Sequence, residues 1–161
     1  MTCAFTGHRP QKLPWGSREE DPRCRALKRL LDEAVAQAAE RGFRTFLCGM
    51  ALGCDTYFAE AVLKRRDADP SLRLEAVLPC PEQTDRWPEA DRRRYEALLM
   101  RCDGLTVLED AYSDGCLLRR NRAMVDRAGL LITVYDGSGG GTGSTIQYAR
   151  SRGVELLPLW I

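Results

Sequence analysis

The sequence predicts a three-layer α/β domain over residues 1–161, in which helices cover both faces of a mostly parallel sheet. Short apolar runs alternate with helical patterns along the whole chain. The apolar runs are continuous rather than alternately apolar and polar, which is typical of strands buried on both faces. No internal repeat or linker divides the chain, and its 161 residues match the size of one ordinary domain.

Six strands and five helices are expected in alternation. The strands are predicted over 2–6, 43–48, 72–78, 104–108, 129–135 and 154–160, and the helices over 24–40, 56–66, 89–101, 116–128 and 143–152. The helix over 24–40 has the clearest pattern, because its apolar positions recur at intervals of three and four residues. Asp21 and Pro22 are suited to begin it, and Gly42 to end it.

Composition argues against several classes of partner. The formal net charge is only +1, so no bulk positive field attracts nucleic acid or an anionic membrane. The seven cysteines form no C-x-x-C pair, which indicates small buried side chains in a reducing compartment and no metal site. The first ten residues turn polar too quickly for a signal peptide, and no apolar stretch reaches the ~18 residues of a membrane span. We therefore expect a cytoplasmic protein without a membrane partner.

The stretch "DGSGGGTGSTIQYA", residues 136–149, holds five of the 14 glycines and joins a predicted strand to a predicted helix. Glycines allow backbone N–H groups to approach a ligand closely, and a helix start adds unpaired donors and partial positive charge. We expect Gly139, Gly140, Gly141 and Thr142 to bind an anion, most naturally a phosphate. Thr142 or Ser144 is alternatively a helix cap. No register matches G-x-G-x-x-G or the P-loop.

Two other strand-to-helix turns have the same character. One contains Gly49, Met50, Gly53 and Asp55; the Asp55 carboxylate either caps a helix or binds ribose hydroxyls. The other contains Gly7, His8 and Arg9, directly after the first strand. His8 is either a packed side chain or a site residue, and Arg9 is suited to bind a phosphate with two hydrogen bonds.

Three further polar or aromatic side chains are ambiguous. Asn121 lies on the apolar stripe of the helix over 116–128, where it makes a structural hydrogen bond or contacts a ligand; its neighbours Arg120 and Arg122 are expected in solvent. Gln83 and Trp87 follow the strand over 72–78, and the Trp87 ring either stacks on a base or fills a packing gap. Trp15, in the first long loop, carries the same two alternatives.

Five motifs occur in a fixed order: "TGHRP", "CGMALGCD", "PEQTDRW", "RRNRAMVD" and "YDGSGGGTGST". Together they resemble the YpsA-like family of bacterial proteins. This family lies in the SLOG superfamily, with the DprA/Smf DNA-processing proteins and the LOG-type cytokinin-activating hydrolases. The resemblance covers nearly the whole chain. It implies a Rossmann-like fold, a pocket at the carboxyl ends of the strands, a nucleotide or ADP-ribose-like ligand and, as one option, a homodimer.

The resemblance also bears on catalysis. LOG-type enzymes carry P-G-G-x-G-T-x-x-E in the glycine turn; Gly139, Gly141 and Thr142 fit this pattern, but Thr145 stands where the catalytic glutamate belongs. Without that carboxylate we expect a binding protein, a sensor or regulator, rather than an enzyme. The alternative is a hydrolase of N-glycosidic or phosphate bonds that uses His8, Asp55 or Asp126. A single-stranded DNA-binding protein is less favoured, because of the near-neutral charge.

Overall fold

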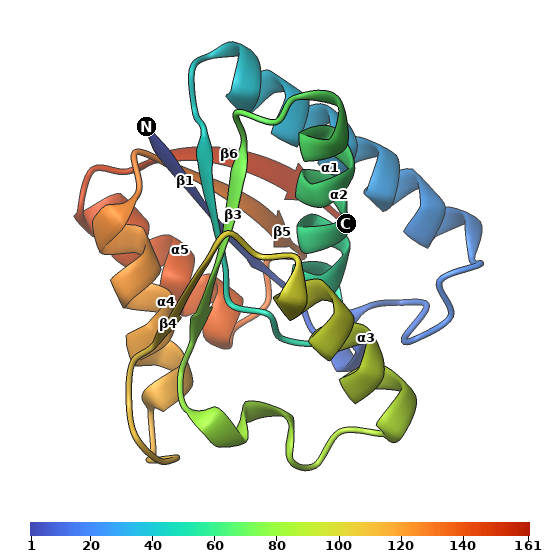
Figure 1. Ribbon diagram of the computed structural model, residues 1–161, viewed down its shortest axis with the longest axis vertical. Coiled ribbons are helices and arrows are strands. Elements are labelled where there is room, and N and C mark those ends of the chain that lie inside the picture. The colour runs from blue at the N-terminus through green and yellow to red at the C-terminus, as the bar shows by residue number, and fades with distance from the viewer.

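The computed structural model describes residues 1–161 and contains six strands and five α-helices (Figure 1). The strands are β1 (Thr2–Gly7), β2 (Thr45–Cys48), β3 (Arg73–Leu78), β4 (Gly104–Val107), β5 (Leu130–Tyr135) and β6 (Glu155–Trp160). The α-helices are α1 (Pro22–Glu40), α2 (Cys54–Ala68), α3 (Glu89–Met100), α4 (Cys116–Arg127) and α5 (Gly141–Ser151). Two short 3-10 helices, η1 (Pro10–Lys12) and η2 (Pro81–Thr84), lie in the loops after β1 and β3.

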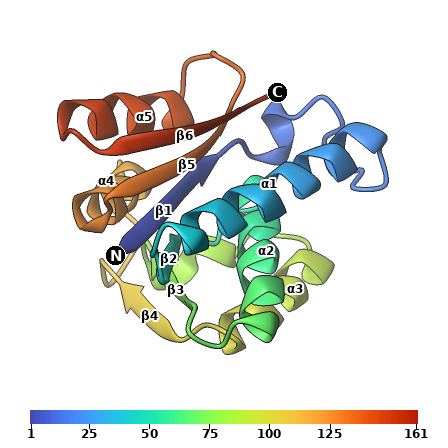
Figure 2. The same ribbon diagram turned by 90° about the horizontal axis from the view of Figure 1, so that it is seen from above.

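The strands form one sheet in the order β4-β3-β2-β1-β5-β6, and every neighbouring pair is parallel. Helices α1, α2 and α3 lie on one side of this sheet, and α4 and α5 on the other (Figure 2). The predicted three-layer α/β architecture is therefore confirmed. The chain builds outward from β1 to β4 and then returns to place β5 on the other side of β1. In such sheets this reversal of strand order opens a crevice at the carboxyl edge, between β1 and β5.

Two hydrophobic cores hold the layers together. The larger one has 30 buried residues, mainly from the sheet, α1 and α2, and the smaller one has seven, between the sheet and α4 and α5. Phe5 stacks on Phe58 with ring centroids 4.5 Å apart, which joins β1 to α2. Trp15 is also buried in the larger core, so it fills a packing position. All seven cysteines are free, and all but Cys102 are fully buried, as the sequence predicted.

The expectation that every strand is buried on both faces is wrong for the two edges of the sheet. In β4, Leu105 is 57% exposed and Val107 42% exposed, and in β6 Trp160 is 62% exposed. Each of these strands pairs with only one neighbour. Burial in a parallel sheet depends on position in the strand order, which a local apolar run does not encode.

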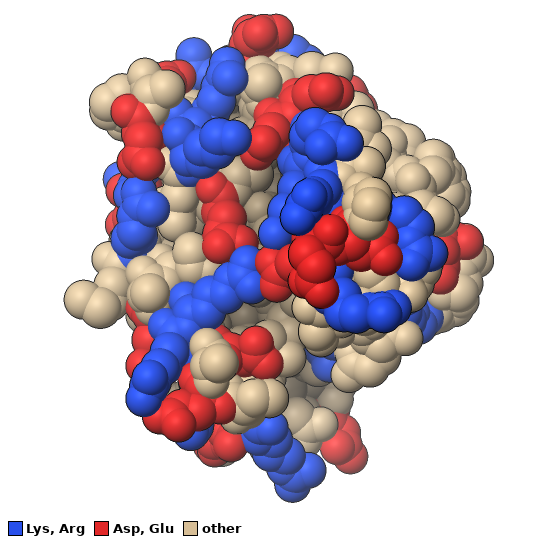
Figure 3. Space-filling view, turned by 90° about the vertical axis from the view of Figure 1, so that its right-hand side faces the viewer, with Lys and Arg blue, Asp and Glu red and all other residues tan.

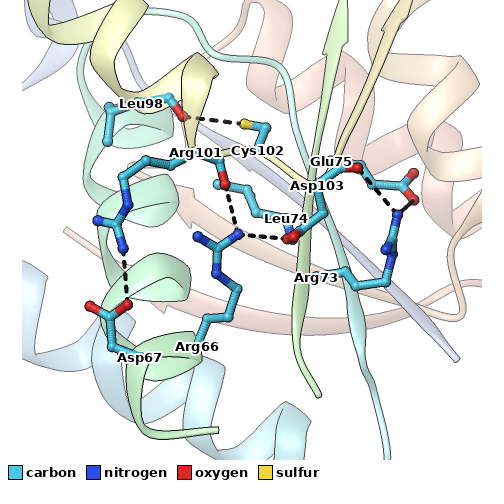
Figure 4. A network of polar contacts seen from close by, with 9 residues as sticks. All are labelled: Arg66, Asp67, Arg73, Leu74, Glu75, Leu98, Arg101, Cys102 and Asp103. Atoms are coloured by element: carbon cyan, nitrogen blue, oxygen red, sulfur yellow. Dashed lines mark hydrogen bonds and ion pairs between the residues drawn. The ribbon is translucent and has the colours of Figure 1, made fainter. Parts of the chain in front are cut away.

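A polar network anchors the amino end of β4 (Figure 4). The Oδ2 atom of Asp103 accepts hydrogen bonds from the Leu74 N–H at 2.9 Å and from Nη1 of Arg66 at 2.7 Å. The same Arg66 nitrogen donates to the Arg101 carbonyl at 2.7 Å. The Asp103 carboxylate thereby binds the start of β3 and the end of α2, and Arg66 links it to the end of α3.

The structure confirms the predicted cap of α1 and corrects the predicted first residue of α5. Asp21 is the N-cap of α1, and its side chain accepts a hydrogen bond from the Arg23 N–H at 2.8 Å. By contrast, α5 begins at Gly141 rather than at residue 143, with Gly140 as its N-cap at φ 123°. None of the helices combines the length and hydrophobicity that a bilayer crossing requires.

Candidate functional site

Two adjoining cavities open at the carboxyl edge of the sheet. The first, of about 650 Å³, lies at the crevice between β1 and β5. The second, of about 610 Å³, adjoins it and is lined mainly by the loop after β3. Both volumes fall in the range of small-molecule sites. The residues that line both cavities are Arg9, Gln11, Ala51, Tyr112 and Leu117. These shared residues form the boundary at which the two cavities adjoin.

The start of α5 presents backbone donors to the first cavity. No side chain caps this helix, so neither Thr142 nor Ser144 acts as the predicted cap, although both line the cavity. The first hydrogen bond of the helix runs from the Ser144 N–H to the Gly140 carbonyl. The N–H groups of the first turn that precede it have no partner within the helix and carry its partial positive charge.

Lys12 places a positive charge at the same turn. Its Nζ donates to the Ser138 hydroxyl at 3.1 Å and to the Gly139 carbonyl. A Cβ atom at Gly140 would lie only 2.8 Å from Nζ, so a glycine lets the lysine approach this closely. Lys12 comes from η1, after β1, while the turn follows β5. The fold therefore places the Lys12 ammonium group at the glycine turn, although the two segments lie 126 residues apart in the sequence.

A buried histidine and an exposed aspartate join the ends of β1 and β5. The ring nitrogen Nε2 of His8 lies 2.9 Å from Oδ1 of Asp136 and 3.1 Å from its backbone nitrogen, and His8 is only 2% exposed. Hydrogen bonds from Ser138, together with the nearby His8, hold the pKa of Asp136 well below its usual range. His8 is thus both packed and part of the cavity wall.

Asp55 lines the first cavity and does not cap α2, since the N-cap is Gly53. Its Oδ2 accepts a hydrogen bond from the Ala51 N–H at 3.0 Å. Burial raises the pKa of Asp55, and the charge of Arg120 opposes this effect. The structure therefore supports the cavity-facing alternative for this carboxylate.

Arg120 contradicts the expectation that it lies in solvent, because it is only 2% exposed. Its Nη1 donates to the carbonyls of Gly49 at 2.5 Å and Val77 at 3.2 Å. Burial lowers the pKa of Arg120, while the nearby Asp55 raises it. Arg122 is exposed as predicted, with its guanidinium over the Tyr148 ring.

The two side-chain amides expected at the site are engaged within the protein. Asn121 donates to the Thr145 hydroxyl at 3.1 Å and accepts from Nε of Arg120 at 2.8 Å. Gln83 donates to the Gly49 carbonyl at 3.2 Å, and its Oε1 lies 3.3 Å from Nη1 of Arg120. These amides position the cavity walls; Asn121 makes a structural hydrogen bond and also lines the first cavity, so its contact with a ligand stays a prediction.

The structure brings together most, but not all, of the predicted site residues. Those that line the first cavity are Gly7, His8, Arg9, Asp55, Asn121, Gly141 and Thr142; those that line the second are Arg9, Gln83 and Trp87. Gly49, Met50, Gly53, Gly139 and Gly140 shape the turns without lining either cavity. Asp126 lies outside both cavities, where it is exposed and accepts a hydrogen bond from the Tyr148 hydroxyl at 2.6 Å.

The sequence did not single out Lys12, Tyr112, Arg120 or Asp136 as site residues. Asp136 could have been identified from the sequence, because it is the first residue of the glycine-rich stretch 136–149. The structure contains no group of three or more His, Cys, Asp or Glu side chains that could hold a metal ion.

Comparison with known proteins shows the family to which the chain belongs. Residues 3–152 match the YpsA model, described as the YspA SLOG family. The chain belongs to this family. It is 27% identical over 135 residues to a UPF0398 protein of Bacillus pumilus, covering 83% of this chain and 72% of that protein. It is 28% identical over 112 residues to a UPF0398 protein of Halalkalibacterium halodurans, covering 68% and 59% respectively. It is 24% identical over 135 residues to YpsA of Bacillus subtilis, covering 83% and 74%.

Solved structures of DNA processing protein A (DprA) share the fold. The Streptococcus pneumoniae protein superposes with a TM-score of 0.64 at 16% identity, over 98% of this chain and 49% of that one. The Helicobacter pylori protein, whose structure concerns its single-stranded DNA binding mode, gives 0.65 at 17% identity, over 98% and 64%. This chain therefore spans less than two thirds of either DprA chain, and the likeness concerns the fold alone.

Proposed function

We propose that this SLOG family member is a cytoplasmic binding protein, a sensor or regulator, for a nucleotide or a nucleotide-derived molecule such as ADP-ribose. One observation carries the proposal: the unbonded amides that begin α5 face the same cavity as Lys12 and Arg9, where the strand order reverses. Amides at a helix start and cationic side chains together favour a phosphate.

The residue at the position of the LOG-type glutamate supports binding rather than hydrolysis. Thr145 is only 1% exposed, donates to the Gly141 carbonyl at 2.8 Å and accepts from Asn121. Its hydroxyl stabilises the turn and supplies no carboxylate. His8 and Asp55 do line the cavity, so incubation with nucleotides followed by chromatography tests the hydrolase alternative. Released base or ribose phosphate that disappears in Asp55→Asn would contradict a purely binding role.

The binding test is calorimetric titration with ADP-ribose, ADP and AMP. We expect at least one of them to bind with a Kd below about 1 mM, and Lys12→Met to weaken that binding about tenfold, which corresponds to about 1.4 kcal/mol. Lys64→Met is the matched control, because Lys64 is 77% exposed on α2 and pairs only with Asp32. The same titration is made with GDP, and no measurable heat from any of the four ligands, or equal affinities for Lys12→Met and the wild type, would contradict the proposal.

Single-stranded DNA binding is the second candidate, favoured by the fold shared with DprA. The net charge of +1 gives it little support, and on the face seen in Figure 3 basic and acidic side chains intermingle. A gel shift at low salt tests it. Tight binding that weakens steeply with added salt would favour DNA over a small nucleotide.

A further inference from the structure

The second cavity has a different charge from the first. The first is lined by the cationic side chains of Arg9, Lys12 and Arg120 against the single carboxylate of Asp55. In the second, the carboxylates of Glu82 and Asp85 balance Arg86 and the shared Arg9. A phosphate is therefore favoured in the first cavity, and an uncharged part of the same ligand in the second.

An aromatic side chain forms part of the wall of the second cavity. Trp87 is partly exposed there, and its ring meets the Tyr95 ring edge-on, with centroids 5.4 Å apart. This contact from α3 fixes the indole in place. A nucleobase that stacks on such a ring gains about 1–3 kcal/mol.

A carboxylate with an unused acceptor lies in the same wall. Glu82, from η2, lines the cavity, but its Oε2 atom is turned away from solvent and has no hydrogen-bond partner, so a ligand reaches this atom only when the side chain turns toward the cavity. A buried acceptor without a donor is costly, and an ionised carboxylate only accepts hydrogen bonds. A ligand group that satisfies it must therefore present N–H or O–H donors.

We propose that the second cavity holds the nucleobase of the bound nucleotide and that the Glu82 side chain turns toward this base and selects guanine. Guanine presents N1–H and the N2 amine side by side on one edge, which matches the two oxygens of a carboxylate. Adenine offers one amine beside an acceptor nitrogen, which a carboxylate repels. The ligand then extends from its phosphates at α5, past Arg9 and Tyr112, to its base beside Trp87. This inference rests on the proposed function and adds the orientation and base preference of the ligand.

The test compares GDP, ADP and IDP, of which IDP lacks only the N2 amine of GDP. We expect GDP to bind about tenfold more tightly than ADP and measurably more tightly than IDP, in keeping with the discrimination of a paired base edge. In Glu82→Gln the preference for GDP over ADP should fall to within about twofold. Glu89→Gln is the matched control, since Glu89 lies at the start of α3 in an exposed pair with Arg93 and outside both cavities.

The outcomes separate the two proposals. Equal affinities for GDP and ADP, or a preference that persists in Glu82→Gln, would overturn the guanine assignment. The proposed function would still stand if binding remained sensitive to Lys12→Met. Absence of binding by all three nucleotides and by ADP-ribose would overturn both.

Discussion

Gly49→Ala is expected to be one of the most destabilising single-methyl additions in this protein. A Cβ atom at position 49 would lie 2.6 Å from Cζ and 2.7 Å from Nη1 of Arg120. A guanidinium in solvent would simply move away. Arg120, however, is 2% exposed and is held by the Gly49 carbonyl, the Val77 carbonyl, Gln83 and Asn121.

The magnitude follows from the bonds that the displaced guanidinium loses. A hydrogen bond from a charged donor contributes about 1.5–3 kcal/mol, and overpacking adds about 1–3 kcal/mol. Allowing for partial relaxation, we expect Gly49→Ala to lower the free energy of unfolding by about 3 kcal/mol, measured by urea denaturation. Gly139→Ala is the control, because no atom lies within 4 Å of its added methyl group. It should change stability by less than about 0.5 kcal/mol.

A double-mutant cycle tests the stated cause. In an Arg120→Met background the added methyl group no longer meets a guanidinium, so Gly49→Ala should cost at least about 1 kcal/mol less than in the wild type. Strict additivity of the two changes, or a Gly49→Ala protein as stable as the wild type, would show that the position of the Arg120 guanidinium does not set the cost.

Two further predictions concern stability. Asp103→Asn should lower the free energy of unfolding by about 1 kcal/mol in urea denaturation, because the charged bond to Arg66 is weakened, whereas the more exposed Asp67→Asn should have little effect. Hydrogen bonding to Arg94 lowers the pKa of Glu19 to about 2 from its ordinary 4.5. Since the pKa is lower in the folded protein, this stabilisation is complete above pH 4.5 and is lost as the pH falls toward 2. Unfolding measured between pH 5 and 2.5 should show a shallower pH dependence in Glu19→Gln, and an unchanged slope would contradict this assignment.

Elements with strong local signals could be predicted from the sequence. The apolar spacing of residues 24–40 and the Asp21-Pro22 pair predict α1 and its cap, which the structure confirms. The glycines of 136–149 likewise predict a strand-to-helix turn, since little else explains so much backbone freedom there. Parallel strands also carry their turns to one edge, so the meeting of residues 7–9, Ala51, Asp55 and residues 141–142 at one cavity follows from the fold class.

Features set by long-range packing could not be predicted in this way. Lys12 lies in an irregular loop, where no period indicates which way a side chain points. Arg120 lies four residues after the buried Cys116 and four before the buried Met124 on α4, and so shares their face. An arginine is usually exposed, however, and it is the carbonyls of Gly49 and Val77 that make its burial favourable. The exposure of β4 depends on its place in the strand order, which its own residues do not determine.

The amides that begin α5 are proposed to hold a phosphate of the ligand. Titration of ¹⁵N-labelled protein with ADP, GDP and ADP-ribose, followed by amide chemical shifts, tests this proposal most directly. We expect the largest shifts at Gly141, Thr142 and Gly143, with little change at Gly153 beyond the far end of the helix. Saturating nucleotide that leaves those three amides unmoved, while shifting signals elsewhere on the molecule, would contradict it.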